Sequence, residues 1–173
     1  SLEVFVSVLP QATFVARVGG EHVKVSALTR PGQSPETFEP TPQQVADLAH
    51  ADLFIGIGMP FEQAWMPRLQ AANPRMQVMD ARAGMDLLPL DPHGHEEDQG
   101  HAGQVLQADA IGDPHLWTSP LLAARMSASI RDTLTALDPA HAEDFAHNQA
   151  QFAAELEDLD QEIRSQLQNL PSR

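Results

Sequence analysis

Residues 113–120, Asp-Pro-His-Leu-Trp-Thr-Ser-Pro, place a single imidazole on a stiff turn. Pro114 fixes its own φ and pushes the residue before it toward extended backbone. Ser119 is a good N-cap and Pro120 suits the first helical position, so a helix is expected to begin just after His115. A histidine whose side-chain direction is fixed by a rigid backbone suits a metal site, because ordering a flexible ligand on binding lowers the affinity for the metal. His115 is therefore a candidate metal ligand, and the alternative is a histidine in an ordinary strand-to-helix turn.

A second set of candidate ligands lies in the proline-rich loop expected at residues 29–40. Its carboxylates are Glu36 and Glu39, and either of them would form an oxygen and nitrogen ligand set with His115. Two protein ligands are too few for tight binding, so at least one more ligand must come from elsewhere. The alternative is that one of the two glutamates caps or braces the loop.

Residues 89–112 interrupt the periodic pattern of the chain with a stretch rich in glycine, glutamine and acidic residues. Its histidines are His93, His95 and His101. This composition predicts an acidic, histidine-bearing loop rather than a helix or strand. Two interpretations of it stay open, namely transient metal capture and an inert spacer.

The elements that must position these residues alternate between strands and helices. The expected strands are 2–9, 22–28, 53–57 and 76–79, and the expected helices are 11–18, 42–50, 61–72, 120–136 and 139–170. This alternation predicts an α/β fold in which a small four-stranded parallel sheet is covered by helices on both faces. Ligands of such sheets sit outside the carboxyl ends of the strands, so the loops after the second, third and fourth strands should converge on one edge. His115 should leave that edge into its helix.

The last predicted helix, residues 139–170, carries one apolar stripe. The stripe consists of Phe145, Phe152, Leu156, Leu159, Ile163, Leu167 and Leu170. At ~45 Å the helix is longer than this small sheet needs as cover, so its far end should pack on something else. We therefore divide the chain into an α/β lobe, residues 1–137, and a long helix, residues 138–173. His141 and His147 on this helix are interpreted as structural or surface histidines.

Composition narrows the classes of function. The chain has 173 residues, which suits one domain, and its net charge of −14 argues against nucleic-acid binding through a basic patch but is compatible with a cationic partner. The absence of cysteine excludes disulfides and thiolate ligands.

No apolar run is long enough to cross a membrane, and no signal peptide precedes the first strand, as in a processed or trimmed protein. An enzyme is not expected, because the chain lacks a Gly-x-Ser-x-Gly elbow, a His-Glu-x-x-His helix and a phosphate-binding glycine loop.

Several segments together resemble the extracytoplasmic receptors of zinc and manganese ABC importers. They are Pro31–Pro42, Ala51–Leu53, Gly58, Phe61–Glu62 with Trp65, and Asp113–Trp117. The match runs in order through nearly the whole chain. The resemblance implies two α/β lobes joined by a rigid helix with one metal ion between them, and a histidine-rich loop over the entrance. It also implies a periplasmic or other extracytoplasmic location and delivery of the metal to a membrane permease.

Carried over residue by residue, the resemblance makes His115 the family's second histidine ligand. Glu36 stands where the family usually has its first histidine. A carboxylate there would shift preference toward harder ions such as manganese or iron(II). The alternative is that this ligand is lost. Glu39, Asp113 and Trp117 lie beside the two positions and are expected to support the site.

The family's remaining ligands come from a C-terminal lobe, whereas this chain stops at Arg173. We therefore expect the N-terminal lobe and interlobe helix of a longer protein, and weak self-association of the isolated lobe. The hypothesis that follows is capture of a divalent metal, with zinc the first choice and manganese or iron(II) behind it. An interaction domain that has lost the metal site is the alternative. A metal-dependent hydrolase ranks last, since only Glu36 is available as a general base.

Overall fold

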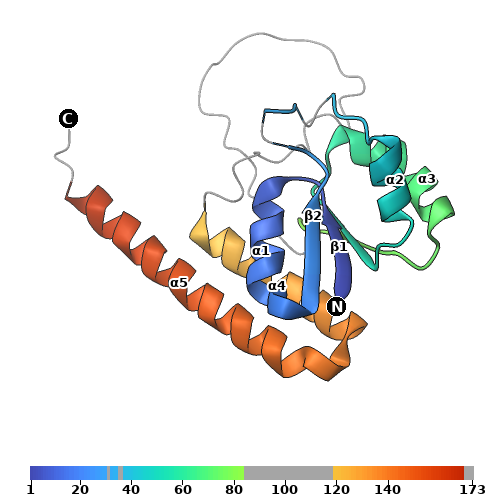
Figure 1. The fold of residues 1–173 in the computed structure, drawn as a ribbon. Coiled ribbons are helices and arrows are strands. Elements are labelled where there is room, and N and C mark those ends of the chain that lie inside the picture. The colour runs from blue at the N-terminus through green and yellow to red at the C-terminus, as the bar shows by residue number, and fades with distance from the viewer. Residues whose placement is uncertain (31, 35–36, 84–118, 170–173) are drawn as a thin grey trace, which may run out of the picture.

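The computed structural model describes residues 1–30, 32–34, 37–83 and 119–169 (Figure 1). In chain order the elements are β1 (Leu2–Val6), α1 (Leu9–Gly19), η1 (Gly20–His22), β2 (Val23–Ala27), α2 (Pro42–Leu48), β3 (Leu53–Gly56), α3 (Pro60–Ala72), β4 (Gln77–Asp80), α4 (Pro120–Leu137), η3 (Pro139–His141) and α5 (Ala142–Gln168). No helix in these ranges combines the length and apolar character that a membrane crossing requires.

Within the described residues, four strands form one parallel sheet in the order β2-β1-β3-β4. Val4 of β1 lies opposite Val25 of β2 on one side and Leu53 of β3 on the other. Parallel neighbours need crossover connections, and the crossovers of this sheet are helical or loop segments. The predicted α/β fold with a parallel sheet and a long helix after it is thereby confirmed.

Alternating side chains of the central strands bury both faces of the sheet. On one face, Val4, Val6 and Ile55 pack in a cluster with residues of α1, α4 and α5. On the other face, Phe5 and Phe54 pack in a cluster with residues of α2 and α3. The sheet is therefore the middle layer of three.

The first strand ends earlier than the sequence suggested, and the first helix begins earlier. The strand stops at Val6, and Leu9 already lies in α1. The cause is Gln11, whose side-chain oxygen accepts hydrogen bonds from the backbone N–H groups of Ser7 (3.1 Å) and Val8 (3.2 Å). These bonds cap the helix, and proline is tolerated in the first turn because its missing N–H would have had no partner there.

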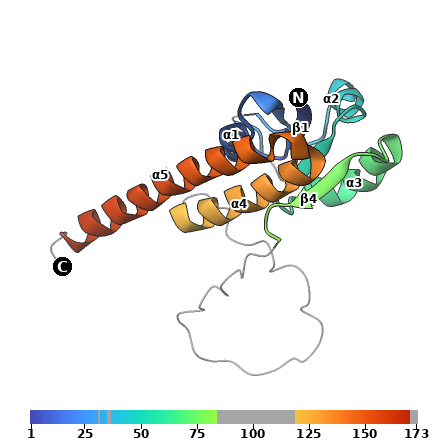
Figure 2. The ribbon, with the colours of Figure 1, turned by 90° about the horizontal axis from the view of Figure 1, so that it is seen from below.

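The long helix α5 packs on α1 and α4 only along its N-terminal half. Phe145 and Phe152 are buried, and Phe152 lies 5.7 Å from the ring of Phe14. Farther along the same stripe, Leu159 and Leu167 are exposed, the latter by 60%. Both views show this C-terminal half projecting past the rest of the lobe (Figures 1 and 2). The helix therefore exceeds the described lobe, as its length predicted.

Candidate functional site

The carboxyl ends of the strands form one edge of the sheet, which we call the strand-exit edge. All strand pairings are parallel, so Val6, Ala27, Gly56 and Asp80 end their strands on the same side. The chain leaves β2 into the loop that contains Glu36, and the chain beyond β4 leads to the segment that contains His115. The strands therefore end on one edge as predicted, whereas Glu36 and His115 themselves lie outside the described residues. This edge is where open parallel sheets bind ligands.

Beneath this edge lies the carboxylate of Glu62, in the first turn of α3 and 9% exposed. One of its oxygens accepts the Ser7 hydroxyl at 2.5 Å and the Ile57 N–H at 2.9 Å, and the other accepts the Gly58 N–H at 3.0 Å. Gly58 has a φ of +81°, a conformation that favours glycine. The side chain from α3 thus joins the exits of β1 and β3.

The exit of β2 is bonded to the same group of residues. The carbonyl oxygen of Ser7 accepts both the backbone N–H of Thr29 (3.1 Å) and its hydroxyl (2.8 Å). The side-chain amide of Gln11 donates to the carbonyl of Gly56 at 3.3 Å. Because Ser7, Gln11, Thr29 and Glu62 are all buried, each bond replaces water contacts that these groups would otherwise need.

The exit of β4 carries an ion pair between Asp80 and Arg82. Arg82 Nε donates to Asp80 Oδ1 at 3.1 Å, and Arg82 Nη2 lies 2.9 Å from Asp80 Oδ2. Burial opposes ionisation of Asp80, but the hydrogen bonds and charge of Arg82 outweigh it and lower the Asp80 pKa. The hydrogen bond that Arg82 donates to Asp80 raises the pKa of Arg82, against partial burial, and the charges of Asp80 and Glu62 add to that rise.

The loop after β2 has a described local hydrogen bond and a buried aromatic side chain near residue 36. The N–H of Thr37 donates to the carbonyl of Ser34 at 3.3 Å, and Phe38 is buried with its ring 5.1 Å from that of Phe61. Farther on, the predicted capping box is confirmed, because Thr41 and Gln44 exchange side-chain to backbone hydrogen bonds.

Of the predicted site residues, only Glu39 is described by the structure, and it is exposed. The others lie outside the described residues and stay predictions: Glu36, His93, His95, His101, Asp113, His115 and Trp117. Ser119 does occupy the N-cap of α4, although its side chain makes no capping hydrogen bond. Within residues 1–30, 32–34, 37–83 and 119–169, no group of three or more histidines and carboxylates could hold a metal ion.

Two histidines form a structural contact far from the strand-exit edge. The rings of His22 and His141 stack with centroids 3.8 Å apart. His22 Nε2 lies 2.9 Å from a carboxylate oxygen of Asp144, and His141 Nδ1 lies 2.7 Å from one of Asp138. This stack joins η1, which follows α1, to η3, which precedes α5. The structural interpretation of His141 agrees with it, and His147 is exposed on α5 as expected of a surface residue.

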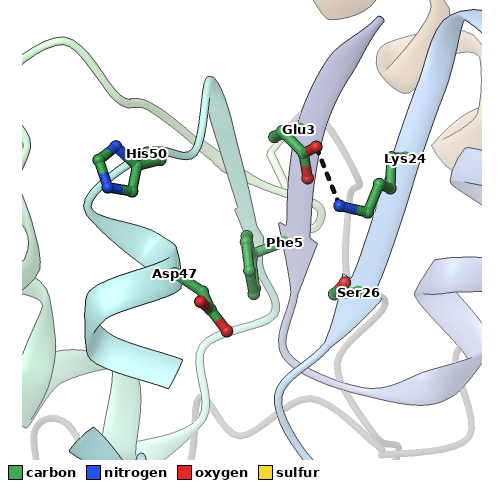
Figure 3. Close-up of a pocket in the computed structure, with 6 residues that line it drawn as sticks. All are labelled: Glu3, Phe5, Lys24, Ser26, Asp47 and His50. Carbon is green, nitrogen blue, oxygen red and sulfur yellow. Dashed lines mark hydrogen bonds and ion pairs between the residues drawn. The ribbon is translucent and has the colours of Figure 1, made fainter. Parts of the chain in front are cut away.

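A separate polar pocket of about 310 Å³ lies on the face of the sheet next to α2 (Figure 3). Lys24 points toward Glu3, with their charged atoms 3.1 Å apart. Asp47 of α2 and His50, two residues after the end of α2, also line the pocket. The Lys24 and Glu3 side chains are 70% and 38% exposed, so this ion pair contributes little stability. None of the residues that line this pocket belongs to the candidate site.

The sequence reasoning did not identify Glu62, Ser7 or Arg82 as site residues. A signal was present, because Glu62 follows Gly58 by four residues and opens a helix directly after a buried strand. A carboxylate at a helix N-terminus is favoured by the free N–H groups there. The residues that share its hydrogen bonds are distant in sequence, so only the fold brings them together.

Comparison with known proteins agrees with the architecture. The chain is 31% identical over 159 residues to the zinc-binding lipoprotein AdcA of Streptococcus pneumoniae, covering 92% of this chain and 31% of that protein. It is 28% identical over 155 residues to the iron-binding protein YfeA of Yersinia pestis, covering 90% and 45%. A crystal structure of ZnuA, 36% identical, superposes with a TM-score of 0.79 and covers all of this chain and 61% of that one.

The chain thus spans about a third to three fifths of the length of these relatives. The family of zinc-uptake complex component A, periplasmic (ZnuA), matches residues 4–173. This match confirms the resemblance that the proline-rich loop and the Asp-Pro-His-Leu-Trp segment indicated. The chain belongs to the ZnuA family of periplasmic metal-uptake components.

Proposed function

We propose that this chain is the N-terminal lobe and interlobe helix of a receptor that captures a divalent metal ion outside the cytoplasm. In this proposal the receptor is a carrier rather than an enzyme, and it delivers the ion to an ABC import permease. The observation that carries the proposal is the strand-exit edge, where hydrogen bonds of buried side chains fix the exits of β1, β2 and β3. Membership of the metal-uptake family supports the assignment of this edge to a metal ion.

The ligands that this lobe would supply are His115 and Glu36. His115 contributes an imidazole nitrogen, which is a ligand of intermediate hardness, and Glu36 contributes a carboxylate oxygen, which is a hard ligand. Zinc accepts both ligand types, whereas a carboxylate in place of a histidine favours manganese or iron(II) more than a second imidazole would. The names of AdcA and YfeA, zinc-binding and iron-binding respectively, support the same range of ions. Zinc is our first choice because of the additional histidines at 93, 95 and 101.

Two ligands from one lobe leave the coordination sphere of the ion incomplete, since zinc takes four ligands and manganese or iron(II) more. We propose that a second lobe supplies the remaining ligands. The exposed stripe on α5, with Leu159, Ile163 and Leu167, fits a helix whose far half packs on further protein. His93, His95 and His101 are proposed to take up the ion transiently and to raise its local concentration near the site.

Calorimetric titration of the chain with zinc, manganese and iron(II) tests the proposal. The variants are Glu36→Ala, His115→Ala and a deletion of residues 92–101, and His147→Ala serves as the matched control because that histidine is exposed on α5. We expect saturable one-to-one binding that both point changes weaken by at least tenfold and that the control leaves unchanged.

Each other outcome has a defined meaning. Binding that disappears only with the deletion would place the ion on the histidine-bearing segment and overturn the assignment of His115 and Glu36. Binding that none of the variants weakens would contradict metal capture at the strand-exit edge. It would favour an interaction domain that keeps the fold without the site.

A further inference from the structure

Glu62 is the only buried charged side chain among the residues that the structure describes. A carboxylate is costly to bury unless hydrogen bonds replace its water, and Glu62 receives three such bonds. Two of the donors, Ile57 N–H and Gly58 N–H, belong to the backbone and can only donate hydrogen bonds. The side chain at position 62 must therefore have two terminal atoms that both accept hydrogen bonds.

The hydrogen bonds of Glu62 continue into the loop that carries Glu36. Ser7 donates its hydroxyl to Glu62, and its backbone carbonyl accepts two hydrogen bonds from Thr29. Thr29 stands two residues after the end of β2, at the start of the loop. A displacement of the Glu62 carboxylate would therefore be transmitted through Ser7 to the first residues of this loop.

The exit of β4 also lies next to Glu62. A side chain at position 58 would collide with the guanidinium of Arg82, so this group lies directly against the backbone of Gly58. Glu62 accepts the N–H of that same glycine at 3.0 Å, and its charge contributes to the raised pKa of Arg82. Glu62 therefore touches or faces residues from the exits of β1, β3 and β4, and it reaches β2 through Ser7.

We propose that Glu62 is a positioning residue for metal capture, which orders the loop of Glu36 through Ser7 and Thr29. The inference rests on the proposed function, because it concerns the same edge of the sheet. A loop that is ordered before the ion arrives loses less conformational freedom on binding, so the affinity is higher. Glu62 acts at the base of the site and is not itself proposed as a ligand.

The decisive variant is Glu62→Gln, which keeps the shape of the side chain but replaces one acceptor oxygen with a donor. Asn73→Ala is the matched control. Asn73 is equally buried and bonds the carbonyls of Leu48 (3.1 Å) and Ala51 (2.8 Å), at the opposite edge of the sheet. Each of the two changes removes hydrogen bonds of a buried side chain that joins several segments, so both should lower the melting temperature.

Amide hydrogen exchange of the metal-free chain separates positioning from plain destabilisation. We expect Glu62→Gln to speed exchange in residues 28–30, 32–34 and 37–41 and to weaken metal binding roughly tenfold. Asn73→Ala should leave both quantities unchanged at a temperature where it is folded. Ser7→Ala should repeat the effect of Glu62→Gln more mildly, and the double variant should lose less affinity than the sum of the two single losses. If Glu62→Gln does not fold, the exchange rates and metal affinities of Ser7→Ala and Asn73→Ala are compared instead, and they test the positioning role in the same way.

The two proposals fail in distinguishable ways. If the parent chain binds no metal, the proposed function of this lobe fails, while the exchange rates still report whether Glu62 orders the loop. If exchange in the loop is unchanged in Glu62→Gln, or changes as much in Asn73→Ala, the positioning role is overturned. Additive losses in the double variant would also overturn the route through Ser7.

Discussion

The ring of Phe38 packs edge-on against the ring of Phe61, with centroids 5.1 Å apart and planes at 72°. Phe38 lies two residues beyond Glu36, and Phe61 lies next to Glu62 in the first turn of α3. This contact fixes the second half of the loop after β2, as Thr29 fixes its start. The proposed ligand position therefore lies between two anchored segments.

Replacing Phe38 with alanine should loosen this anchor. The side chain is 8% exposed, so Phe38→Ala should destabilise the fold by about 3 kcal/mol, because it removes apolar contacts and leaves a cavity. Thermal or urea unfolding measures the loss. Phe38→Leu should recover most of the stability but not the edge-on ring contact. If Phe38→Ala lowers the unfolding free energy no more than the substitution of an exposed residue does, Phe38 does not anchor the loop.

A side chain at Gly58 should destabilise the fold. Its φ of +81° costs an L-residue about 1–2 kcal/mol, and an added Cβ would collide with the guanidinium of Arg82. Gly32→Ala is the matched control, because Gly32 has a similar φ of +86° but nothing within 4 Å of the added atom. Unfolding free energies should fall for both variants and fall further for Gly58→Ala. Equal losses would mean that Arg82 moves aside without cost.

The ion pair of Asp80 and Arg82 should contribute to the pH dependence of stability. The pKa of Asp80 is lower in the folded protein than its ordinary value of 3.8, so the folded state favours the ionised form. This stabilisation is complete above the unfolded-state pKa and is lost as pH falls through the folded-state value. The Asp80→Asn variant should therefore be less stable than the parent at pH 6, with a difference that shrinks below about pH 4. Melting curves of the parent and of Asp80→Asn from pH 7 to pH 3 measure this difference in stability. A difference that stays the same at every pH would contradict the ion pair of Asp80 and Arg82.

The far half of α5 should be dispensable for the stability of this lobe. Ile163 and Leu167 are 39% and 60% exposed, so replacing both with lysine should change the unfolding free energy by less than about 0.5 kcal/mol per site. Phe152→Ala in the buried half is the contrast and should cost about 3 kcal/mol.

The same double change tests the predicted self-association of the isolated lobe. An exposed apolar stripe on a helix promotes contacts between copies, and two added lysines would remove most of it. Sedimentation velocity at high concentration should show weak association of the parent that the double variant lacks. A strictly monomeric parent would contradict the prediction.

The sequence by itself determined the elements of this fold and their approximate bounds, because these depend on local properties. The capping box at Thr41 and Gln44, the apolar run from Leu53 and the Asp138-Pro139 pair each act over a few residues. The alternation of strands and helices then favoured a parallel sheet, and the spacing of Phe145, Phe152 and the later leucines indicated a helix longer than its lobe. Local sequence made His115 and either Glu36 or Glu39 the ligand candidates. Family resemblance then favoured Glu36 of the two glutamates, and all of these assignments stay predictions.

Only the tertiary structure decided what lies beneath the candidate site. Ser7, Thr29, Glu62 and Arg82 come from four separate connections, and no periodic pattern links them, because their contacts are set by strand order. The order β2-β1-β3-β4 puts β1 between β2 and β3, so Ser7, the first residue after β1, can bond the chain at both neighbouring strands. A buried carboxylate cannot be distinguished from a surface one by residue type. Its role follows from the donors around it, and these converge only once the chain has folded.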